Sequence, residues 1–296
     1  MRARRLLLLV VPVVIVVMAG GAWLLGKRPP RPPAIAFAPY QDEYGTKPDF
    51  ARLEHELPLT PAQRTAITPA SLTALNQEQV NQLYARLTAG PIPDGPFRGD
   101  LFFPKGTSGD VRLAEIVGGL GALGLPLGPL KAEGLSRALW KGKVFYRDQR
   151  LLRNQIDDLA DLTPLLGHDT SKIQRLSFEG QRTWLLFPAK LYCGQSLLDG
   201  RRESIVIDYA FSDDLEGYRE NPDVLTGRHG LAIRDEIRMV RPGFYQGRTY
   251  MRGVFLLNFT LESDAIAKRD TAAFISTGII AEDCWVGTQK VATLPR

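Results

Sequence analysis

Hydrophobic residues follow different spacings in the two ends of the chain. An uninterrupted apolar run of 20 residues occupies Leu6–Leu25, whereas from Trp140 onward short segments alternate between apolar and polar residues. An uncharged helix of that length spans roughly 30 Å, the hydrocarbon thickness of a bilayer, and alternation with a period of two is typical of half-buried strands. The pattern predicts a transmembrane helix and a separate β-rich domain.

The sequence divides into four regions. Residues 1–26 are predicted to be a transmembrane anchor, and residues 27–50 a proline-rich linker that favours extended polyproline II conformation. Residues 51–134 are expected to be helical and irregular. Residues 135–296 are expected to form an antiparallel β domain.

Two parts of the region 51–134 have distinct patterns. A helix is predicted to end at Gly90, and Thr68-Pro69 and Asn76 are equally good starting points, because both supply N-cap side chains. Gly118–Leu130 is apolar and rich in glycine and proline, which excludes a regular helix. This segment is interpreted as buried irregular chain or as a mobile flap over an apolar cavity.

The β domain is predicted to contain eight to nine antiparallel strands without intervening helices, which indicates a barrel or a sandwich. Asp199-Gly200 predicts a tight hairpin turn, and Pro242-Gly243 predicts another. The expected strands are 143–147, 151–156, 173–178, 183–196, 203–211, 233–240, 245–261, 271–280 and 284–291.

The positive charge belongs to the membrane flanks. The chain carries a formal charge of +5, but residues 1–31 hold six basic residues and no acidic one. The remainder has 31 Lys and Arg against 32 Asp and Glu. This distribution disfavours nucleic-acid binding and fits a bilayer as the partner of the N-terminal helix.

The length of the apolar run favours an uncleaved anchor over a cleaved signal peptide, whose apolar region is shorter. A short basic tail ahead of a large domain favours a single-pass protein of a bacterial inner membrane with its domain in the periplasm. Cys193 and Cys284 bear on this, because an oxidising compartment would allow one disulfide. Paired cysteines and two buried free thiols both remain open.

Two carboxylates are predicted to point toward apolar neighbours. Asp235 shares a strand face with Ile233 and Ile237, and Asp208 shares one with Val206 and Ala210. A buried carboxylate is costly unless it is paired, so such groups mark ligand sites or fix strand register. In the second interpretation Asp208 pairs with Arg234 or Arg238.

Aromatic side chains recur in the predicted sheet, among them Trp140 and Tyr245, and either pack the core or line a ligand site. The candidate ligand-binding residues are therefore Trp140, Asp208, Asp235, Arg238 and Tyr245. No His or Cys cluster has metal-ligand spacing, and no phosphate-binding loop precedes a helix, so neither a metal nor a cofactor is expected.

Several segments resemble uncharacterised bacterial proteins with calycin-like, lipocalin-type barrels. The resemblance rests on Trp140–Phe145, Asp199-Gly200, Ser204–Tyr209, Ile233–Arg238 and Pro242–Gly247, and covers about residues 135–290. It implies an up-and-down barrel that binds a hydrophobic small molecule. The expected function is therefore membrane-anchored binding of a lipid or other apolar molecule. The alternatives are a hydrolase-like acid/base enzyme using Asp208, Asp235 or Glu236, and an envelope scaffold.

Overall fold

The structure, a computed structural model, describes residues 34–40, 48–107, 140–159, 166 and 170–287. The predicted anchor and the glycine-rich segment 118–130 lie outside these residues, as does part of the predicted linker. Among the residues that are described, no helix combines the length and apolar character needed to cross a membrane. The elements below all belong to one unit, Ile35–Arg296.

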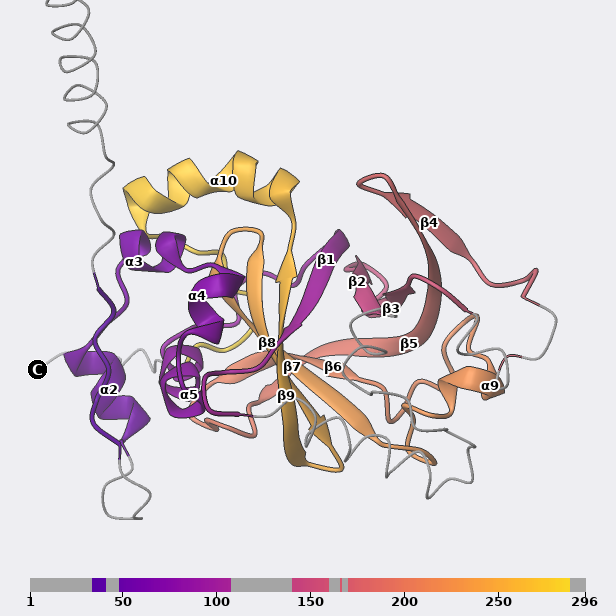
Figure 1. Cartoon of the computed structure of the whole chain (residues 1–296), viewed down its shortest axis with the longest axis horizontal. Helices are drawn as coiled ribbons and strands as arrows, with labels where there is room; N and C mark the ends of the chain where they lie inside the picture. The colour runs from indigo at the N-terminus through magenta and orange to yellow at the C-terminus, as the bar shows by residue number, and fades with distance from the viewer. Residues whose placement is uncertain (1–33, 41–47, 108–139, 160–165, 167–169, 288–296) are drawn as a thin grey trace, which may run out of the picture. The chain divides into compact units, whose positions relative to one another are not determined.

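The sheet has nine strands, shown in Figure 1: β1 (Gly95–Phe102), β2 (Trp140–Tyr146), β3 (Leu151–Ile156), β4 (Arg175–Phe178), β5 (Gln181–Gln195), β6 (Glu203–Asp208), β7 (Ile233–Arg241), β8 (Phe244–Met251) and β9 (Val254–Glu262). Their order is β3-β2-β1-β9-β8-β7-β6-β5-β4, and an additional pairing of β3 with β5 closes the ring. Since β4 extends beyond that closing pair, eight antiparallel strands form the barrel. The prediction of a mainly β fold with a closed antiparallel barrel is confirmed.

The barrel begins earlier than the sequence pattern predicts. β1 lies within the region expected to be helical and irregular, and it joins β2 to β9. Its Gly95-Pro96 start is typical of a turn, but proline is tolerated at the beginning of a strand. The predicted start of the β domain at residue 135 is therefore too late.

The predicted strand 245–261 is in fact the hairpin of β8 and β9. Arg252 and Gly253, which join them, both have positive φ, at 50° and 81°. Positive φ at both central residues is the geometry of a two-residue type I′ turn. Pro242-Gly243 forms the predicted turn between β7 and β8. Asp199-Gly200, in contrast, lies in a longer connection between β5 and β6, where buried Asp199 accepts hydrogen bonds from Arg201.

The C-terminal part is a helix where strands were predicted. α10 covers Asp264–Thr277 and ends at Gly278, which has the left-handed conformation of a C-cap. The apolar residues of 271–280 fall in two runs, 272–275 and 279–280, and do not alternate, and alanine favours helix. The predicted strand 271–280 is therefore wrong. Residues 284–287 form no strand either, and the rest of the predicted strand 284–291 lies outside the described residues. The neighbour of β9 is β1, not a C-terminal strand.

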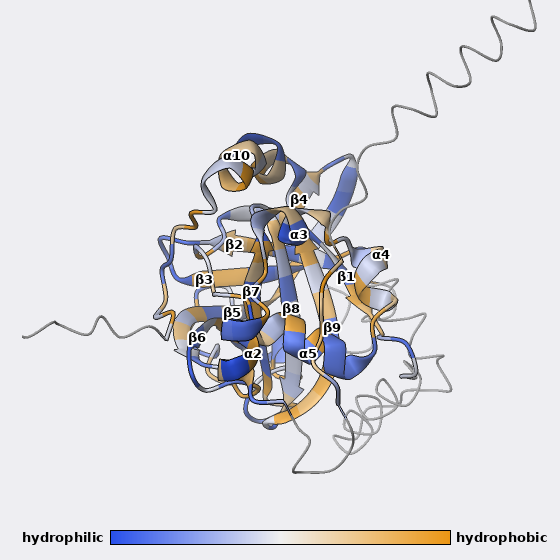
Figure 2. Ribbon diagram, turned by 90° about the vertical axis from the view of Figure 1, so that its left-hand side faces the viewer, coloured by the Kyte–Doolittle hydropathy of each residue, from blue (hydrophilic) through white to orange (hydrophobic). Residues whose placement is uncertain are grey.

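Short helices cover the outer face of β7–β9. These are α2 (Phe50–Glu56), α3 (Pro61–Ala66), α4 (Pro69–Thr73) and α5 (Gln77–Ala85), of which the last three begin with capping boxes. Thr68 and Asn76 both act as N-caps, so both predicted starting points are used, by separate helices. Figure 2 shows hydrophobic stretches along the strands and mainly hydrophilic residues in α5.

One end of the barrel interior is filled by large side chains. Phe97 packs edge to face against Phe145 and Tyr245, and all three are buried. Further along, Phe259 lies over Gly247 of the neighbouring strand, where a Cβ would come within 2.2 Å of the ring. The absence of a side chain at Gly247 is therefore what makes room for the Phe259 ring. The other end of the interior contains a cavity.

Candidate functional site

The cavity at the open end of the barrel has a volume of about 300 Å³. It lies where β6 ends and β7 begins, and its walls are mainly apolar. The residues that line it are Leu101, Trp140, Lys143, Asn154, Ile156, Phe187, Tyr209, Leu225, Thr226, Leu231, Ile233, Asp235, Thr249, Leu256, Leu257 and Phe259. Apolar pockets with a few convergent polar groups are typical small-molecule sites.

A buried ion pair forms the polar part of this cavity. Lys143 Nζ lies 2.9 Å from Asp235 Oδ2, and the two side chains are 3% and 5% exposed. Thr249 Oγ1 donates to Asp235 Oδ1 at 2.7 Å from the opposite position on β8. The ammonium also donates to the hydroxyl oxygen of Tyr209 at 2.5 Å. Each charge is thus compensated inside the barrel, as buried charges require.

Asn154 connects this pair to the cavity wall. Its side-chain oxygen accepts hydrogen bonds from Trp140 Nε1 at 2.9 Å and from Lys143 Nζ at 3.0 Å. Its amide nitrogen donates to the Tyr209 hydroxyl and to the backbone oxygen of Phe187, both at 3.0 Å. Asn154 therefore links side chains of β2, the backbone of β5 and the Tyr209 hydroxyl group, which follows β6.

The ion pair determines the protonation state of the cluster. Burial alone would lower the pKa of Lys143, but the Asp235 carboxylate and the Tyr209 oxygen outweigh it, so the pKa is raised overall. Burial raises the pKa of Tyr209 to about 12, although the Lys143 ammonium opposes the shift. At neutral pH Lys143 is therefore charged and Tyr209 carries its proton.

A β-bulge brings Phe187 to the cavity. Between Leu152 and Asn154 on β3 the pairing with β5 shifts by an extra residue, and Phe187 has a φ of +51°. Its backbone N–H donates to Asp223 Oδ1 at 2.8 Å, while its carbonyl accepts from Asn154. Burial raises the pKa of Asp223 to about 6 despite backbone N–H donors from Arg219 and Phe187. Two side chains thus hold the left-handed backbone of Phe187.

A second irregularity orients Trp140 and Lys143. The pairing of β2 with β3 shifts between Trp140 and Gly142, so residues 140 and 143 both line the cavity instead of alternating. Gly142 has a φ of +140°, and a Cβ there would lie 2.0 Å from the carbonyl oxygen of Phe97. Glycine is required at this position.

The structure places the five predicted site residues in different surroundings. Trp140 and Asp235 lie together in the cavity. Tyr245 is at the filled end of the barrel, where its hydroxyl donates to the Pro91 carbonyl at 2.7 Å. The sequence pattern predicts neither this separation nor the neighbours that complete the site.

Asp208 and Arg238 lie on the outer face of the barrel. Asp208 stands opposite Arg234 in register, but its carboxylate accepts from the Tyr192 hydroxyl at 2.8 Å. The predicted inward orientation of Asp208 is therefore wrong. The prediction failed because Ile205, Val206 and Ile207 are all buried, so hydrophobicity along β6 does not distinguish its inner face from its outer face.

Arg238 is fully buried beneath the helices and donates to Ser204 Oγ at 2.9 Å. It also donates to the backbone oxygen of Tyr84 at 3.2 Å and lies 3.5 Å from an oxygen of Asp199. These contacts tie α5 and the β5–β6 connection to the outer wall. Arg238 is therefore separated from the cavity by the sheet.

The candidate site also contains Lys143, Asn154, Tyr209 and Thr249, which are not among the five residues predicted from the sequence. Thr249 lies opposite Asp235 across the β7–β8 hairpin, so the turn at Pro242-Gly243 was the available signal. The inward orientation of Lys143 depends on the irregularity at Gly142, which alternation does not reveal.

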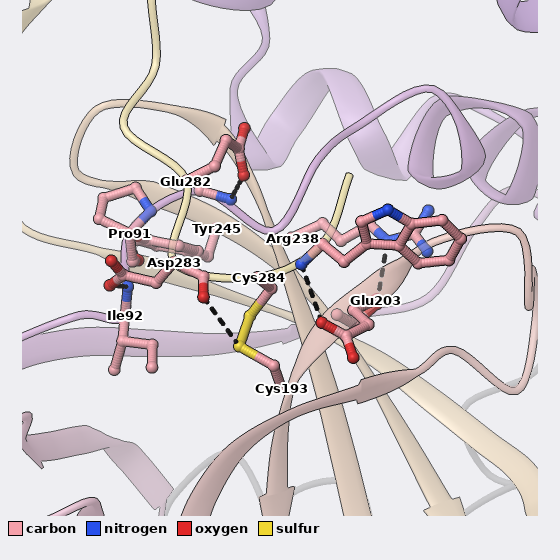
Figure 3. The surroundings of a disulfide bond; sticks show 12 residues. Pro91, Ile92, Cys193, Glu203, Arg238, Tyr245, Glu282, Asp283 and Cys284 are labelled. Atoms are coloured by element: carbon pink, nitrogen blue, oxygen red, sulfur yellow. Dashed lines mark hydrogen bonds between the residues drawn. A yellow bond between two sulfur atoms is a disulfide. The ribbon is translucent and has the colours of Figure 1, made fainter. Parts of the chain in front are cut away.

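The two cysteines form a disulfide at the filled end of the barrel (Figure 3). Cys193 of β5 and Cys284, beyond α10, have Cα atoms 5.3 Å apart. Next to the bond, Asp283 accepts from the Ile92 N–H at 2.7 Å, and Glu203 accepts from the Trp285 N–H at 2.8 Å. Cys193, Cys284 and Glu203 are close enough to surround an ion, but sulfurs in a disulfide supply no thiolate ligand.

Comparisons with known proteins do not indicate a function. No protein-family model matches the sequence, and no curated protein matches it. A crystal structure of a protein from Thermomonospora curvata is similar to 65% of this chain and 90% of that chain, with 20% sequence identity and a TM-score of 0.30.

Proposed function

We propose that this protein binds a small apolar molecule in the cavity of a calycin-like barrel. The observation that carries the proposal is an apolar cavity whose buried charges, Lys143 and Asp235, already neutralise each other. An interior that served only to stabilise the fold would be packed throughout, as it is around Phe97. Here the barrel walls enclose space instead.

The size of the cavity limits the ligand. Its volume of about 300 Å³ is twice that of a cavity of roughly 150 Å³ that accommodates one benzene molecule. It is at the lower end of the range of about 300–1,000 Å³ for small-molecule sites. The proposed ligand therefore has about a dozen non-hydrogen atoms, the size of a medium-length alkyl chain with a polar head.

We further propose that the N-terminal run Leu6–Leu25 anchors the domain in a bacterial inner membrane, with the barrel in the periplasm. The uncharged length of that run supports an anchor. The bond between Cys193 and Cys284 supports an oxidising compartment, where disulfides persist. The ligand would then be an apolar molecule available near the membrane.

The acid/base enzyme receives less support from the same residues. Asp235 accepts from Lys143 and Thr249, so it would have to give up an ion pair before taking a proton from a substrate. Asp208 lies outside the barrel. Glu236 is buried on the outer face, where one oxygen accepts from the Leu197 N–H and from Arg234.

Calorimetric titration of the full-length protein in amphipol with 1-decanol tests the binding proposal. Leu225→Trp, at the cavity wall, is expected to fill the space and remove the saturable heat. Leu197→Trp is the matched control, because Leu197 is 49% exposed and does not line the cavity. It should bind like the wild type. Equal titrations for the wild type and Leu225→Trp would show that the cavity binds nothing and would overturn the proposal.

A further inference from the structure

The side-chain hydrogen-bond donors in the cavity are already used. Lys143 has three N–H groups and three acceptors, namely Asn154 Oδ1, the Tyr209 oxygen and Asp235 Oδ2. Asn154 uses both amide hydrogens, and the Trp140 N–H donates to Asn154. Donors of this kind gain nothing from a ligand acceptor unless they first give up a partner.

The hydroxyl groups of the cavity are committed as donors in the same way. Thr249 donates to Asp235 Oδ1, and Thr226 donates to the backbone oxygen of Asp223 at 3.1 Å. The Tyr209 hydroxyl oxygen lies 3.3 Å from Asn154 Oδ1 and 3.5 Å from Asp235 Oδ2, and either oxygen can accept its hydrogen. Among the described residues that line the cavity, every side-chain donor therefore has an acceptor within the protein.

Some hydrogen-bond acceptors in the cavity, in contrast, still have free positions. A carboxylate offers about four acceptor positions. Asp235 Oδ1 receives a hydrogen bond from Thr249, and Oδ2 receives one from Lys143 and has the Tyr209 hydroxyl at 3.5 Å, so Oδ1 keeps an acceptor position. The Thr249 oxygen also has unused lone pairs, because it acts as a donor in its hydrogen bond with Asp235. The cavity can thus accept a hydrogen bond from a ligand more readily than it can donate one.

The charge balance of the cavity also favours a neutral ligand that donates a hydrogen bond. Lys143 and Asp235 cancel, so a second anion in the cavity would face Asp235 without a cation of its own. Burying an uncompensated charge is far more costly than burying a neutral hydroxyl group that is hydrogen-bonded.

We infer that the cavity selects a neutral apolar molecule that carries a hydroxyl group, such as a medium-chain alcohol, and rejects a fatty-acid anion. The hydroxyl donates to Asp235 or Thr249 while the alkyl chain lies against the apolar walls. This inference rests on the proposed binding function and specifies the chemical class of its ligand.

A series of ligands with nearly equal size tests it on the unmodified full-length protein. The probes are 1-decanol, decanoate and 1-methoxynonane, titrated by calorimetry at pH 6.5 in amphipol, with the Leu225→Trp titration subtracted from each. 1-Decanol is expected to bind about tenfold more tightly than decanoate, which lacks a cation, and than the ether, which cannot donate.

Asp235→Asn provides the test by mutation. Without the carboxylate, Lys143 has no counter-ion, and a bound decanoate would supply one. The preference is expected to reverse, with decanoate binding at least about tenfold more tightly than it does to the wild type. Asp208→Asn is the matched control, because the same substitution outside the barrel should leave the preference unchanged.

The outcomes separate this inference from the binding proposal. Decanoate or the ether binding as tightly as 1-decanol in the wild type overturns the inference and leaves binding established. The same holds if a folded Asp235→Asn protein keeps the preference for 1-decanol. If no probe gives a titration that depends on the cavity, the binding proposal itself fails. The wild-type series does not use Asp235→Asn, so the test does not depend on how that variant folds.

Discussion

Removing Lys143 tests whether its ion pair with Asp235 holds the barrel interior together. Lys143→Met keeps an unbranched side chain of similar length but removes the ammonium. The Asp235 carboxylate, 5% exposed, would then be buried without its counter-ion. Asn154 and Tyr209 would each lose a hydrogen-bond donor as well.

The expected cost follows from the burial of both partners. Breaking a buried pair by removing one member costs about 3–5 kcal/mol, because it leaves an uncompensated charge. Replacing both members by apolar residues is often close to neutral. Lys143→Met should therefore lower the free energy of unfolding by about 3–5 kcal/mol, and Lys143→Met/Asp235→Leu should recover most of that loss.

Urea denaturation followed by circular dichroism measures these differences on the full-length protein. Lys141→Met is the matched control on the same strand, since the Lys141–Asp157 pair is partly exposed, with side chains 28% and 47% accessible. Such pairs contribute about 0–1 kcal/mol. A loss of less than about 1 kcal/mol for Lys143→Met, or a double variant no more stable than the single one, would refute the reasoning.

Three further predictions concern other parts of the barrel. Because the pKa of Asp223 is about 6 when folded and about 3.9 in an unfolded chain, the folded state holds the extra proton between these values. Stability should therefore fall as the pH rises from 4 to 6, by up to about 3 kcal/mol, and Asp223→Asn should lack this component in pH-dependent urea unfolding. The disulfide between Cys193 and Cys284 spans 91 residues, so replacing both by serine should cost about 4 kcal/mol, and an unchanged unfolding curve would contradict its role. Gly247→Ala should cost about 1–3 kcal/mol by overpacking against Phe259, and Phe259→Leu in the same chain should restore part of it.

Alternation predicted the barrel and the inward orientation of Asp235 because its strand has a clear polar face. Arg234, Glu236 and Arg238 alternate with Ile233, Asp235 and Ile237, and the structure places the second set inside. The same reasoning failed for Asp208, since all three residues before it are buried. Where helices cover the outer wall of a barrel, polarity no longer separates inside from outside.

Local irregularities account for the rest of the site. Lys143 shares the interior with Trp140 only because the pairing of β2 shifts at Gly142, and Phe187 enters the cavity through a bulge in β5. Both features depend on contacts with strands that are distant in sequence. Gly142 lies against the carbonyl oxygen of Phe97, and the carbonyl oxygen of Phe187 accepts a hydrogen bond from Asn154. A pattern that is read along one strand does not contain that information.

The central claim is that the barrel cavity holds an apolar molecule with its polar head at Asp235. A crystal structure of the full-length protein with 8-bromo-1-octanol tests it most directly. The anomalous signal of bromine should lie among the apolar walls near Leu231, with the hydroxyl within hydrogen-bonding distance of Asp235 or Thr249. Bromine found elsewhere at saturating ligand, with the cavity empty or closed by its own side chains, would contradict the account.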